Sequence, residues 1–522
     1  MRWDRYLGLR LVIGLGTALA VCDYASNRSL WLDEAKLSRN FLGRNWLQLL
    51  SPLDHDQVAP IGYLWTVEGS FELCRGLGLP VEYGLRLPSL VAFLGVAYLT
   101  WHLARRLTGS ALAALCASAF VCSNPYALRY ASEAKQYMLD TAVALLVFMV
   151  SLSVVGPVDD QSGTRASRQP RGAASGLPAM ETGALRTGAR TGARKGTPAA
   201  YALFGAICIW LSNIAVLFLV VGGSHVVVHR FRAEGSARWA WAPVVWMASF
   251  GAYFALFVHG HPTRDFMVRY WQHAFLPWPP WSPAMGPFVS SHLVGMLSKQ
   301  LAGPLWAPLV VALLGSIAWA IWRRNYRLAS YASLPVLLHL ALSGLSLYPF
   351  AARLTLYIVP VAGLLLGYIV GEVARALGQR RWVPILATIP WLVPLSVGAS
   401  RFPFEKEEYK QTLAYVNAHW VDGQSVYVHT GARQAFEFYR SIGRKPPVDP
   451  TVAIVGKAKD GVSDQELAGL KGDVWFLFTY VGDRKSELNG ETRTIAKLEQ
   501  RGARVVRSHL RTGSSAYLVA MR

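Results

Sequence analysis

Long apolar stretches separated by short polar turns dominate the first 400 residues of the chain. Most of these stretches approach the length of about 20 residues that a helix needs to cross a bilayer. Helices satisfy all their backbone polar groups internally, as a spanning segment must. The pattern therefore predicts an α-helical polytopic membrane protein with about 11 transmembrane helices. The predicted spans are residues 6–23, 88–103, 110–122, 137–155, 201–211, 214–228, 240–258, 301–322, 328–347, 354–374 and 382–397.

The hydrophobic pattern changes after residue 400. Alternating segments typical of strands are interspersed there with amphipathic segments typical of helices. This order predicts a small α/β domain at residues 401–522, following a transmembrane domain at residues 1–400. It contains no phosphate-binding glycine motif, so we expect an accessory or recognition role. The predicted strands are 425–429, 474–481, 504–510 and 515–520, and the predicted helices are 405–420, 433–439 and 492–501.

Charged residues lie mainly in the turns between the apolar stretches. Hydrophobic residues make up 53% of the chain and charged residues 16%, which excludes an ordinary soluble protein. Because the excess basic residues lie in these turns, the net charge of +21 indicates how the protein is oriented in the membrane and not a nucleic-acid partner. With the N-terminus in the cytoplasm, the basic turns lie inside, and loops 24–87 and 259–300 and the C-terminal domain lie outside. We expect a multi-pass protein of the inner (plasma) membrane. The basic turns are 105–106, 165–195, 230–238, 323–327 and 375–381.

Residues 156–198 are rich in Gly, Ala, Arg, Ser and Thr and contain almost no large apolar side chains. Such a segment buries too little apolar surface to offset the entropy cost of ordering its backbone. We expect a disordered basic loop on the cytoplasmic side. A patch that binds anionic membrane lipids is the alternative.

Two adjacent carboxylates, Asp33 and Glu34, follow the first apolar stretch. They lie where the chain leaves the membrane, so a loop facing a cavity there would place them for chemistry on a lipid-borne substrate. The alternative role is structural, because Asp33 can cap a helix that begins at Glu34. The two roles are compatible, since a capping carboxylate at the membrane surface can also face a cavity.

A second polar segment in the same loop contains Asp54, His55 and Asp56. Together with Asp33 or Glu34, these side chains offer carboxylate and imidazole ligands for a divalent metal. Their spacing matches no specific metal motif, and a solvated turn is the alternative. The expected cofactor is accordingly either none or a divalent cation, Mg²⁺ or Mn²⁺, held by Asp33, Glu34, His55 and Asp56.

Cationic side chains occur at two other outer positions. Arg129 and Lys135 flank Glu133 in a short outer loop, and Arg353 follows a break at residues 348–349. Cations at these positions suit a phosphate, since Lys offers a compact charge and Arg a bidentate fork. In the alternative, Glu133 only pairs with Arg129 at helical spacing, and Arg353 extends to lipid headgroups.

The outer loop at 259–300 is dense in Trp, Pro and His. Aromatic rings stack on sugar faces, but they also anchor proteins at membrane interfaces. An interface belt is the default expectation for Trp271, Trp278 and Trp281.

Five sequence blocks together resemble a known superfamily. In order and spacing they are similar to the GT-C fold membrane glycosyltransferases that use polyprenyl-phosphate sugars. The similarity is to the bacterial branch near the aminoarabinose transferases, the protein O-mannosyltransferases and the rhizobial lipopolysaccharide glycosyltransferases. The blocks are residues 30–35, 52–60, 83–89, 130–140 and 350–354, the last followed by Pro360.

The resemblance implies inverting transfer of a hexosyl or pentosyl group from polyprenyl phosphate to an extracytoplasmic acceptor, which is a glycolipid, a cell-wall glycan or a protein hydroxyl. Asp33 matches the acid regarded as the catalytic base, and Glu34 matches its neighbour, which orients it or a metal. Lys135 stands where many relatives carry Arg, so it offers no bidentate fork. The implied donor-phosphate residues are Lys135, Arg129 and Arg353, and the further pocket residues are His55, Asp56, Gln57, Glu133 and Tyr137.

A single carboxylate suffices for this reaction because a polyprenyl phosphate is already a good leaving group, unlike the leaving group of a glycosidase. An ionised Asp that accepts the acceptor proton in the transition state typically contributes about 10²–10⁴-fold. Cations near the phosphate stabilise the charge that develops there.

Two other classes of function are the alternatives: a transporter or flippase of lipid-linked sugars, and a non-catalytic membrane scaffold that presents the C-terminal domain. Transporters often contain repeated halves and charges at mid-membrane depth. The sequence shows no evident internal repeat and its charges cluster in the outer loops, which favours the enzyme. The expected partners are a polyprenyl-phosphate sugar, an extracytoplasmic acceptor and membrane lipids.

Overall fold

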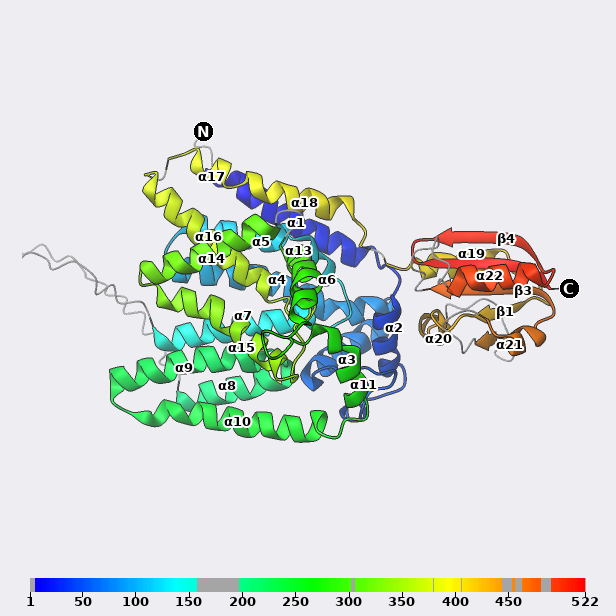
Figure 1. Cartoon of the computed structure of the whole chain (residues 1–522), viewed down its shortest axis with the longest axis horizontal. Helices are drawn as coiled ribbons and strands as arrows, with labels where there is room; N and C mark the ends of the chain where they lie inside the picture. The colour runs from blue at the N-terminus through cyan, green and yellow to red at the C-terminus, as the bar shows by residue number, and fades with distance from the viewer. Residues whose placement is uncertain are drawn as a thin grey trace, which may run out of the picture.

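The computed structural model describes residues 5–156, 197–301, 306–378, 380–404, 406–443, 453–455, 462–479 and 490–521. A bundle of long helices forms one part of the molecule, and a β-sheet with its own helices forms the other (Figure 1). Residues 157–196, which make up nearly all of the predicted disordered loop, lie outside the described residues.

The helices of the bundle follow the apolar stretches of the sequence. Within the described residues, seven helical segments are long and apolar enough to cross a membrane, while α5, α8 and α14 are apolar but shorter. The chain is therefore a mostly helical, multi-pass membrane protein, and the number of about 11 crossings stays a prediction. The helices are α1 Leu7–Ala25, α4 Val81–Thr108, α5 Ala111–Ser123, α7 Tyr137–Val155, α8 Pro198–Leu211, α9 Ala215–Glu234, α10 Trp241–Tyr253, α14 Trp306–Trp322, α15 Tyr326–Gly344, α16 Ile358–Ala376, α17 Val383–Leu386 and α18 Ile389–Ser400.

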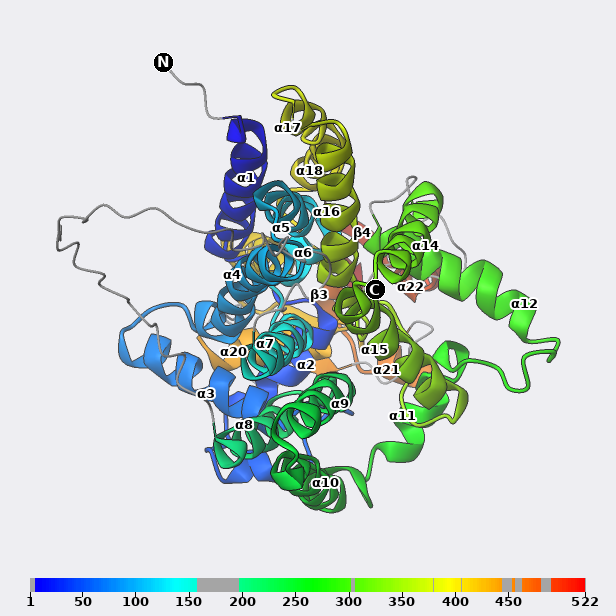
Figure 2. The ribbon, with the colours of Figure 1, turned by 90° about the vertical axis from the view of Figure 1, so that its left-hand side faces the viewer.

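Helix α5 packs against α1, α4 and α16 within the bundle (Figure 2). Glycines allow these helices to approach closely. A Cβ atom added at Gly367 of α16 would lie 2.3 Å from the Ala113 carbonyl oxygen, and one added at Gly16 of α1 would lie 2.0 Å from the Cys122 carbonyl oxygen. Small residues at helix contacts favour van der Waals packing, which drives helix association in a bilayer.

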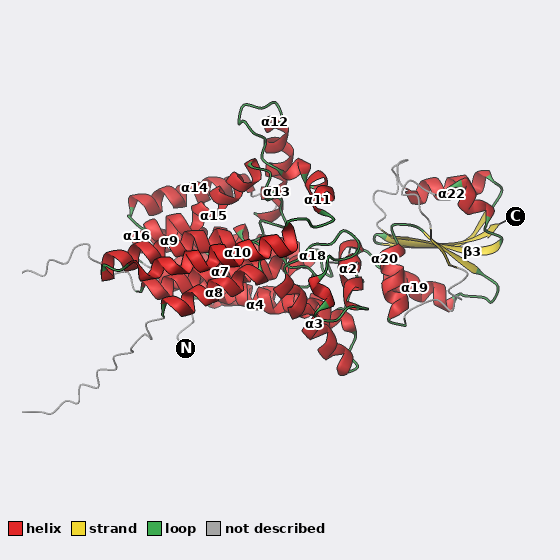
Figure 3. Cartoon of the chain, turned by 90° about the horizontal axis from the view of Figure 1, so that it is seen from below, coloured by secondary structure: helices red, strands yellow, loops and turns green. Residues whose placement is uncertain are grey.

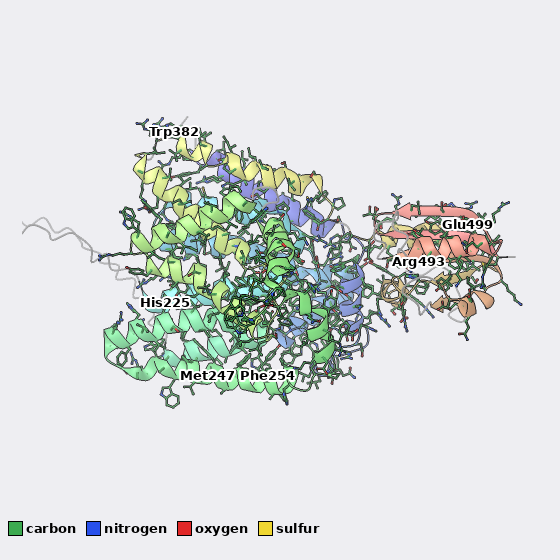
Figure 4. All side chains as sticks on the ribbon, viewed as in Figure 1. His225, Met247, Phe254, Trp382, Arg493 and Glu499 are labelled. Carbon is green, nitrogen blue, oxygen red and sulfur yellow. The ribbon has the colours of Figure 1, made fainter. Side chains whose placement is uncertain are left out.

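The perimeter of the bundle carries exposed apolar side chains, as a lipid-facing surface does. Met247 on α10 and Trp382 beside α17 are 66% and 43% exposed, and both lie at the edge of the bundle (Figure 4).

The first outer loop, expected at residues 24–87, contains two helices, of which the sequence suggested only the first, with a start at Glu34. These are α2 Leu32–Ser38 and α3 Ile61–Gly76, and α4 begins at Val81 and not at residue 88. The loop is thus a folded layer that covers one end of the bundle, called the outer end after the orientation that the charge pattern predicts.

Pro88 lies inside α4, whereas we predicted that it begins the span because proline cannot donate a helical hydrogen bond. The missing bond would leave the Gly84 carbonyl without its helical donor. Ser70 Oγ on α3 donates to that carbonyl at 2.6 Å. A side chain from a neighbouring helix therefore replaces the missing bond, and α4 continues through the proline.

The outer aromatic loop at 259–300 is largely helical. Trp278 and Trp281 are 71% and 83% exposed, while Trp271 is half-buried. Its helices are α11 Arg264–Tyr270, α12 Met285–Pro287 and α13 Val294–Gln300, with η5 Gln272–Ala274 and η6 Phe288–Leu293 between them.

The C-terminal region forms a mixed five-stranded sheet in the order β2-β1-β3-β5-β4. Strands β1, β2 and β3 are parallel, and β5 runs antiparallel to both β3 and β4. Helices α19 and α20 lie on one face and α22 on the other (Figure 3). The strands are β1 Ser425–Val428, β2 Ala453–Val455, β3 Gly472–Thr479, β4 Arg504–Arg511 and β5 Ser514–Met521, and the helices are α19 Tyr409–Ala418, α20 Arg433–Ser441, α21 Asp464–Ala468 and α22 Gly490–Gln500.

The face covered by α19 and α20 packs on the first outer loop. A single cluster of buried apolar side chains includes Leu30 of the loop together with Phe438 and Trp475 of the C-terminal region. Beside it, Arg39 Nη2 pairs with Glu437 Oε2 at 2.6 Å. The C-terminal region thus shares a core with the loop that carries the acid pair, and an independent domain from residue 401 stays a prediction.

Candidate active site

The acid pair lies in the first turn of α2, and its two members have different environments. The helix begins at Leu32, and the Glu34 carboxylate accepts a hydrogen bond from the Trp31 backbone N–H at 3.3 Å. Glu34, and not Asp33, therefore caps α2, which corrects the expectation of a helix that begins at Glu34. Side chains in the first turn of a helix that do not cap it remain available for contacts elsewhere.

Asp33 pairs with an arginine that lies 320 positions further along the chain. Arg353 Nη1 donates to Asp33 Oδ2 at 2.7 Å, and the two side chains are 19% and 24% exposed. Burial raises the pKa of the Asp33 carboxyl, but Lys135 and Arg353 together outweigh burial and hold that pKa below its ordinary value. Asp33 is therefore ionised at neutral pH and still reachable from solvent.

Aromatic rings of the outer loop and of α7 surround Arg353. Its guanidinium lies 4.7 Å from the ring centroid of Trp271 and 5.9 Å from that of Tyr137. Its Nη2 lies 3.5 Å from the Tyr270 hydroxyl. Cation–π contacts fix the plane of the guanidinium, so the aromatic loop belongs to the site as well as to the membrane interface.

Lys135 brings a second cation to Asp33. Its Nζ donates to Gln57 Oε1 at 2.6 Å, and Gln57 Nε2 donates to the His55 carbonyl at 3.1 Å. Burial lowers the pKa of Lys135 to about 8, although Asp33 acts in the opposite direction. Lys135 is therefore charged at neutral pH, and Gln57 holds it in place.

Glu34 is fully buried and its oxygens are occupied by donors. Oε1 accepts from the Ala134 N–H at 2.7 Å and Oε2 from Arg86 Nη2 at 2.8 Å, with Arg28 Nη1 at 3.6 Å. Burial raises the pKa of Glu34, but Arg86 and Arg28 outweigh it and keep the pKa below its ordinary value. Glu34 thus links α2 to α4 and to the turn before Lys135. It positions Asp33 while its own side chain stays buried.

His55 and Asp56 form a tight turn, with left-handed φ values of +65° and +55°. Burial and the neighbouring Arg39 lower the pKa of His55. In the described part of the chain, no three His, Cys, Asp or Glu side chains gather in a way that could hold a metal ion. Asp33, Glu34, His55 and Asp56 are therefore not brought together as a metal site, because Glu34 turns inward to Arg86.

Glu133 and Arg129 lie next to a lysine that the sequence analysis did not single out. Glu133 is buried, and its Oε2 lies 3.2 Å from Lys406 Nζ and 4.0 Å from Arg129 Nε. Arg129 therefore pairs with Glu133, while Arg353 pairs with Asp33 and Lys135 donates to Gln57 close enough to influence the Asp33 charge. The expected phosphate-binding set divides into two groups.

Arg86 and Arg28, which hold Glu34, were not predicted as site residues, whereas Tyr270, beside Arg353, belongs to the aromatic loop that the sequence indicated. Arg86 falls within the 83–89 block that carries the family resemblance, so a signal for it existed. Arg28 lies in a turn with no distinguishing pattern, and only the fold brings it to the site.

The arrangement presents one ionised carboxylate beside two cations at the outer surface of a membrane bundle. The carboxylate can accept a proton, and the cations can bind an anionic group, with Arg353 offering two parallel donors. Glu34, Gln57 and the aromatic rings restrict the positions of these three side chains.

Comparison of the sequence with family models finds no match. No curated protein matches it either. Comparison with solved structures does find a similar fold, and it shows that the chain has a GT-C-like fold.

One similar structure is ArnT from Cupriavidus metallidurans bound to undecaprenyl phosphate, with 13% identity, a TM-score of 0.51 and coverage of 97% of each chain. The Archaeoglobus fulgidus oligosaccharyltransferase in complex with zinc and sulfate is 10% identical, with a TM-score of 0.46 and coverage of 89% of this chain and 67% of that one. The mycobacterial arabinofuranosyltransferase AftD is 12% identical, with a TM-score of 0.41 and coverage of 100% of this chain and 40% of that one.

Proposed function

We propose that the protein is a glycosyltransferase that moves a sugar from a polyprenyl phosphate to an extracytoplasmic acceptor hydroxyl, with Asp33 as general base. The observation that carries the proposal is the ionised Asp33 carboxylate beside Arg353 and Lys135 at the outer end of the bundle. The likeness to ArnT, whose structure contains undecaprenyl phosphate, supports a lipid phosphate as the donor.

In the proposed reaction the acceptor oxygen attacks the anomeric carbon as the bond between that carbon and the phosphate oxygen breaks. The proton of the acceptor hydroxyl passes to Asp33, and the electron pair of the broken bond leaves with the lipid phosphate. Arg353 and Lys135 stabilise the negative charge that grows on the phosphate. One displacement gives inversion at the anomeric carbon.

In this proposal, binding of the donor breaks the Asp33–Arg353 ion pair and frees the base. A bound phosphate competes for the two donors of Arg353, and this releases the Asp33 carboxylate toward an acceptor hydroxyl. The donor therefore binds first and the acceptor second in this proposal.

The proposal assigns the phosphate charge to Arg353 and Lys135, since the described residues offer no cluster of metal ligands. The divalent cation expected from the sequence, Mg²⁺ or Mn²⁺, stays a prediction, and the proposed reaction does not require it. The cytoplasmic N-terminus and the extracytoplasmic side of the acceptor follow from the charge pattern, and together with the inner-membrane location they belong to the same proposal.

The test is transfer of radiolabelled sugar from a panel of polyprenyl-phosphate sugars by purified wild type, Asp33→Asn and Asp54→Asn in detergent. Asp54 is a matched control, because it lies in the same loop and pairs with Arg44 with its side chain 64% exposed. We expect wild type and Asp54→Asn to transfer one sugar with inversion, and Asp33→Asn to lose at least about 10²-fold. Translocation of the donor without transfer would favour a flippase. Transfer by folded Asp33→Asn at the wild-type rate would exclude Asp33 as the general base.

A further inference from the structure

Two charged residues between α18 and α19 lie against the start of α2. Lys406 Nζ is 3.2 Å from the ring centroid of Trp31. Glu407 Oε1 accepts a hydrogen bond from the Leu32 N–H at 3.3 Å. Trp31 and Leu32 directly precede Asp33, so this connecting segment contacts the first turn of the helix that carries the candidate base.

Lys406 also touches the turn that carries the second cation of the site. Its Nζ lies 3.2 Å from Glu133 Oε2, and Glu133 is two residues from Lys135. The same ammonium group therefore contacts the α2 side of the site and the Lys135 side. The distance between Asp33 and Lys135 depends on both.

We infer that Lys406 and Glu407 are positioning residues, which hold the first turn of α2 at a fixed distance from the turn that carries Lys135. The inference rests on the proposed function, because it assigns to these residues a role in the same reaction. It also gives the C-terminal region a role in catalysis besides recognition, since the connecting segment contributes side chains to the site.

The burial of these groups supports a role other than stability. Glu133 and Glu407 are 1% and 3% exposed. Within the described residues, Glu133 Oε1, Glu407 Oε2 and Trp31 Nε1 are buried without a hydrogen-bond partner. Buried ion pairs with unsatisfied atoms stabilise a fold poorly, whereas they do fix one arrangement of the elements that they join.

A simple docking role is the competing explanation, and other contacts already provide docking. The shared apolar cluster and the Arg39–Glu437 ion pair hold the C-terminal region on α2. Arg39 follows the last turn of α2, at the end away from Asp33. An ion pair at the far end of the same helix is therefore a matched control for Lys406.

The protonation of Lys406 provides an independent readout. Burial lowers the pKa of Lys406 to about 8, although Glu133 acts in the opposite direction. Lys406 is charged at neutral pH and loses its charge as the pH rises through about 8. The charged groups around it are Glu133, Arg129, Glu34 and Arg28, with Glu407 next to it in the chain.

The first experiment compares kcat and the donor KM of full-length wild type, Lys406→Met, Lys406→Arg and Arg39→Met. A misplacement of about 1 Å costs on the order of 10²-fold in rate. We expect Lys406→Met to lower kcat by about that factor with little change in donor KM, and Lys406→Arg to recover most of the loss. Arg39→Met should stay near the wild-type kcat. A kcat loss for Arg39→Met as large as that for Lys406→Met would show that Lys406 only docks the C-terminal region on α2, and it would overturn the inference.

Lys406→Met leaves the buried Glu133 with only the more distant Arg129, at 4.0 Å, so this variant risks misfolding. The double variant Lys406→Met/Glu133→Gln removes both charges and restores a neutral pair. We expect it to unfold at nearly the wild-type temperature and to keep the kcat loss. A folded double variant with wild-type kcat would overturn the inference.

The second experiment measures kcat against pH at saturating donor. A bound phosphate raises the pKa of Lys135, so the alkaline fall of kcat in the complex reports on Lys406. We expect wild-type kcat to fall above pH about 8 and Lys406→Arg to show no such fall. An identical alkaline fall in both proteins would overturn the inference. Absence of transfer by wild type with every donor would instead overturn the proposed function.

Discussion

The outer end of the helix bundle and its membrane-embedded body are held together in different ways. In the body, helices pack through small residues, as Gly367 does against the Ala113 carbonyl. At the outer end, buried charges join elements far apart in sequence, as Glu34 of α2 does with Arg86 of α4. Because buried ion pairs rarely add net stability, the difference indicates that the outer end is organised to hold Asp33, while shape alone suffices for the body.

The largest expected effect comes from breaking the buried network at the outer end. Arg86→Met leaves the Glu34 carboxylate buried without its main partner, which costs about 3–5 kcal/mol. We expect loss of folded protein by size-exclusion chromatography and thermal unfolding in detergent. Met247→Ala on the lipid face should change stability by less than about 0.5 kcal/mol.

The double variant Arg86→Met/Glu34→Gln controls for the unpaired charge. It should recover much of the stability lost in Arg86→Met. A stable Arg86→Met protein would contradict the view that the outer end depends on paired charges.

The next effect concerns the cation that pairs with Asp33. Arg353→Met removes both the partner of Asp33 and the bidentate phosphate donor, so we expect kcat/KM for the donor to fall about 10²–10³-fold. Arg353→Lys should recover part of this, because Lys keeps the charge without the fork. Steady-state transfer assays measure both. An Arg353→Met enzyme with wild-type kcat/KM would show that the phosphate binds elsewhere.

A smaller effect concerns pH. The pKa of Lys135 is lowered to about 8, so in the free enzyme its charge is lost as the pH rises through that value. We therefore expect donor affinity to decrease above pH about 8 in wild type and to decrease less in Lys135→Arg. Equilibrium binding of a sugar-free polyprenyl phosphate at several pH values measures this directly. Equal pH dependence in both proteins would exclude Lys135 from phosphate binding.

The smallest effect is expected at the turn of His55 and Asp56. Asp56→Asn and treatment with a chelator should leave transfer nearly unchanged, because these residues do not gather with Asp33 and Glu34 into a set of metal ligands. Loss of transfer in chelator with recovery on addition of Mn²⁺ or Mg²⁺ would contradict this.

The sequence predicts well what depends on neighbouring residues. The predicted span at 137–155 coincides with α7 Tyr137–Val155, because apolar length alone determines it. The start of α4 was wrong because Ser70 of another helix compensates for Pro88.

Contacts between distant segments could not be predicted from the sequence, because they depend on the fold and not on neighbouring residues. Asp33 and Glu34 are both acids in one turn, and only the positions of Arg86 and Arg353 in the fold leave one buried and the other partly exposed. No local pattern distinguishes Lys406 from a solvated lysine, although it lies 3.2 Å from Glu133.

The central claim is that Asp33 is a base held beside two phosphate-binding cations. The most direct measurement is donor binding and single-turnover transfer on the same preparation of Asp33→Asn. Removing this negative charge beside Arg353 and Lys135 should leave binding of polyprenyl phosphate equal or tighter, while transfer falls by at least about 10²-fold. Transfer at the wild-type rate by a folded Asp33→Asn protein, or loss of donor binding together with transfer, would contradict the account.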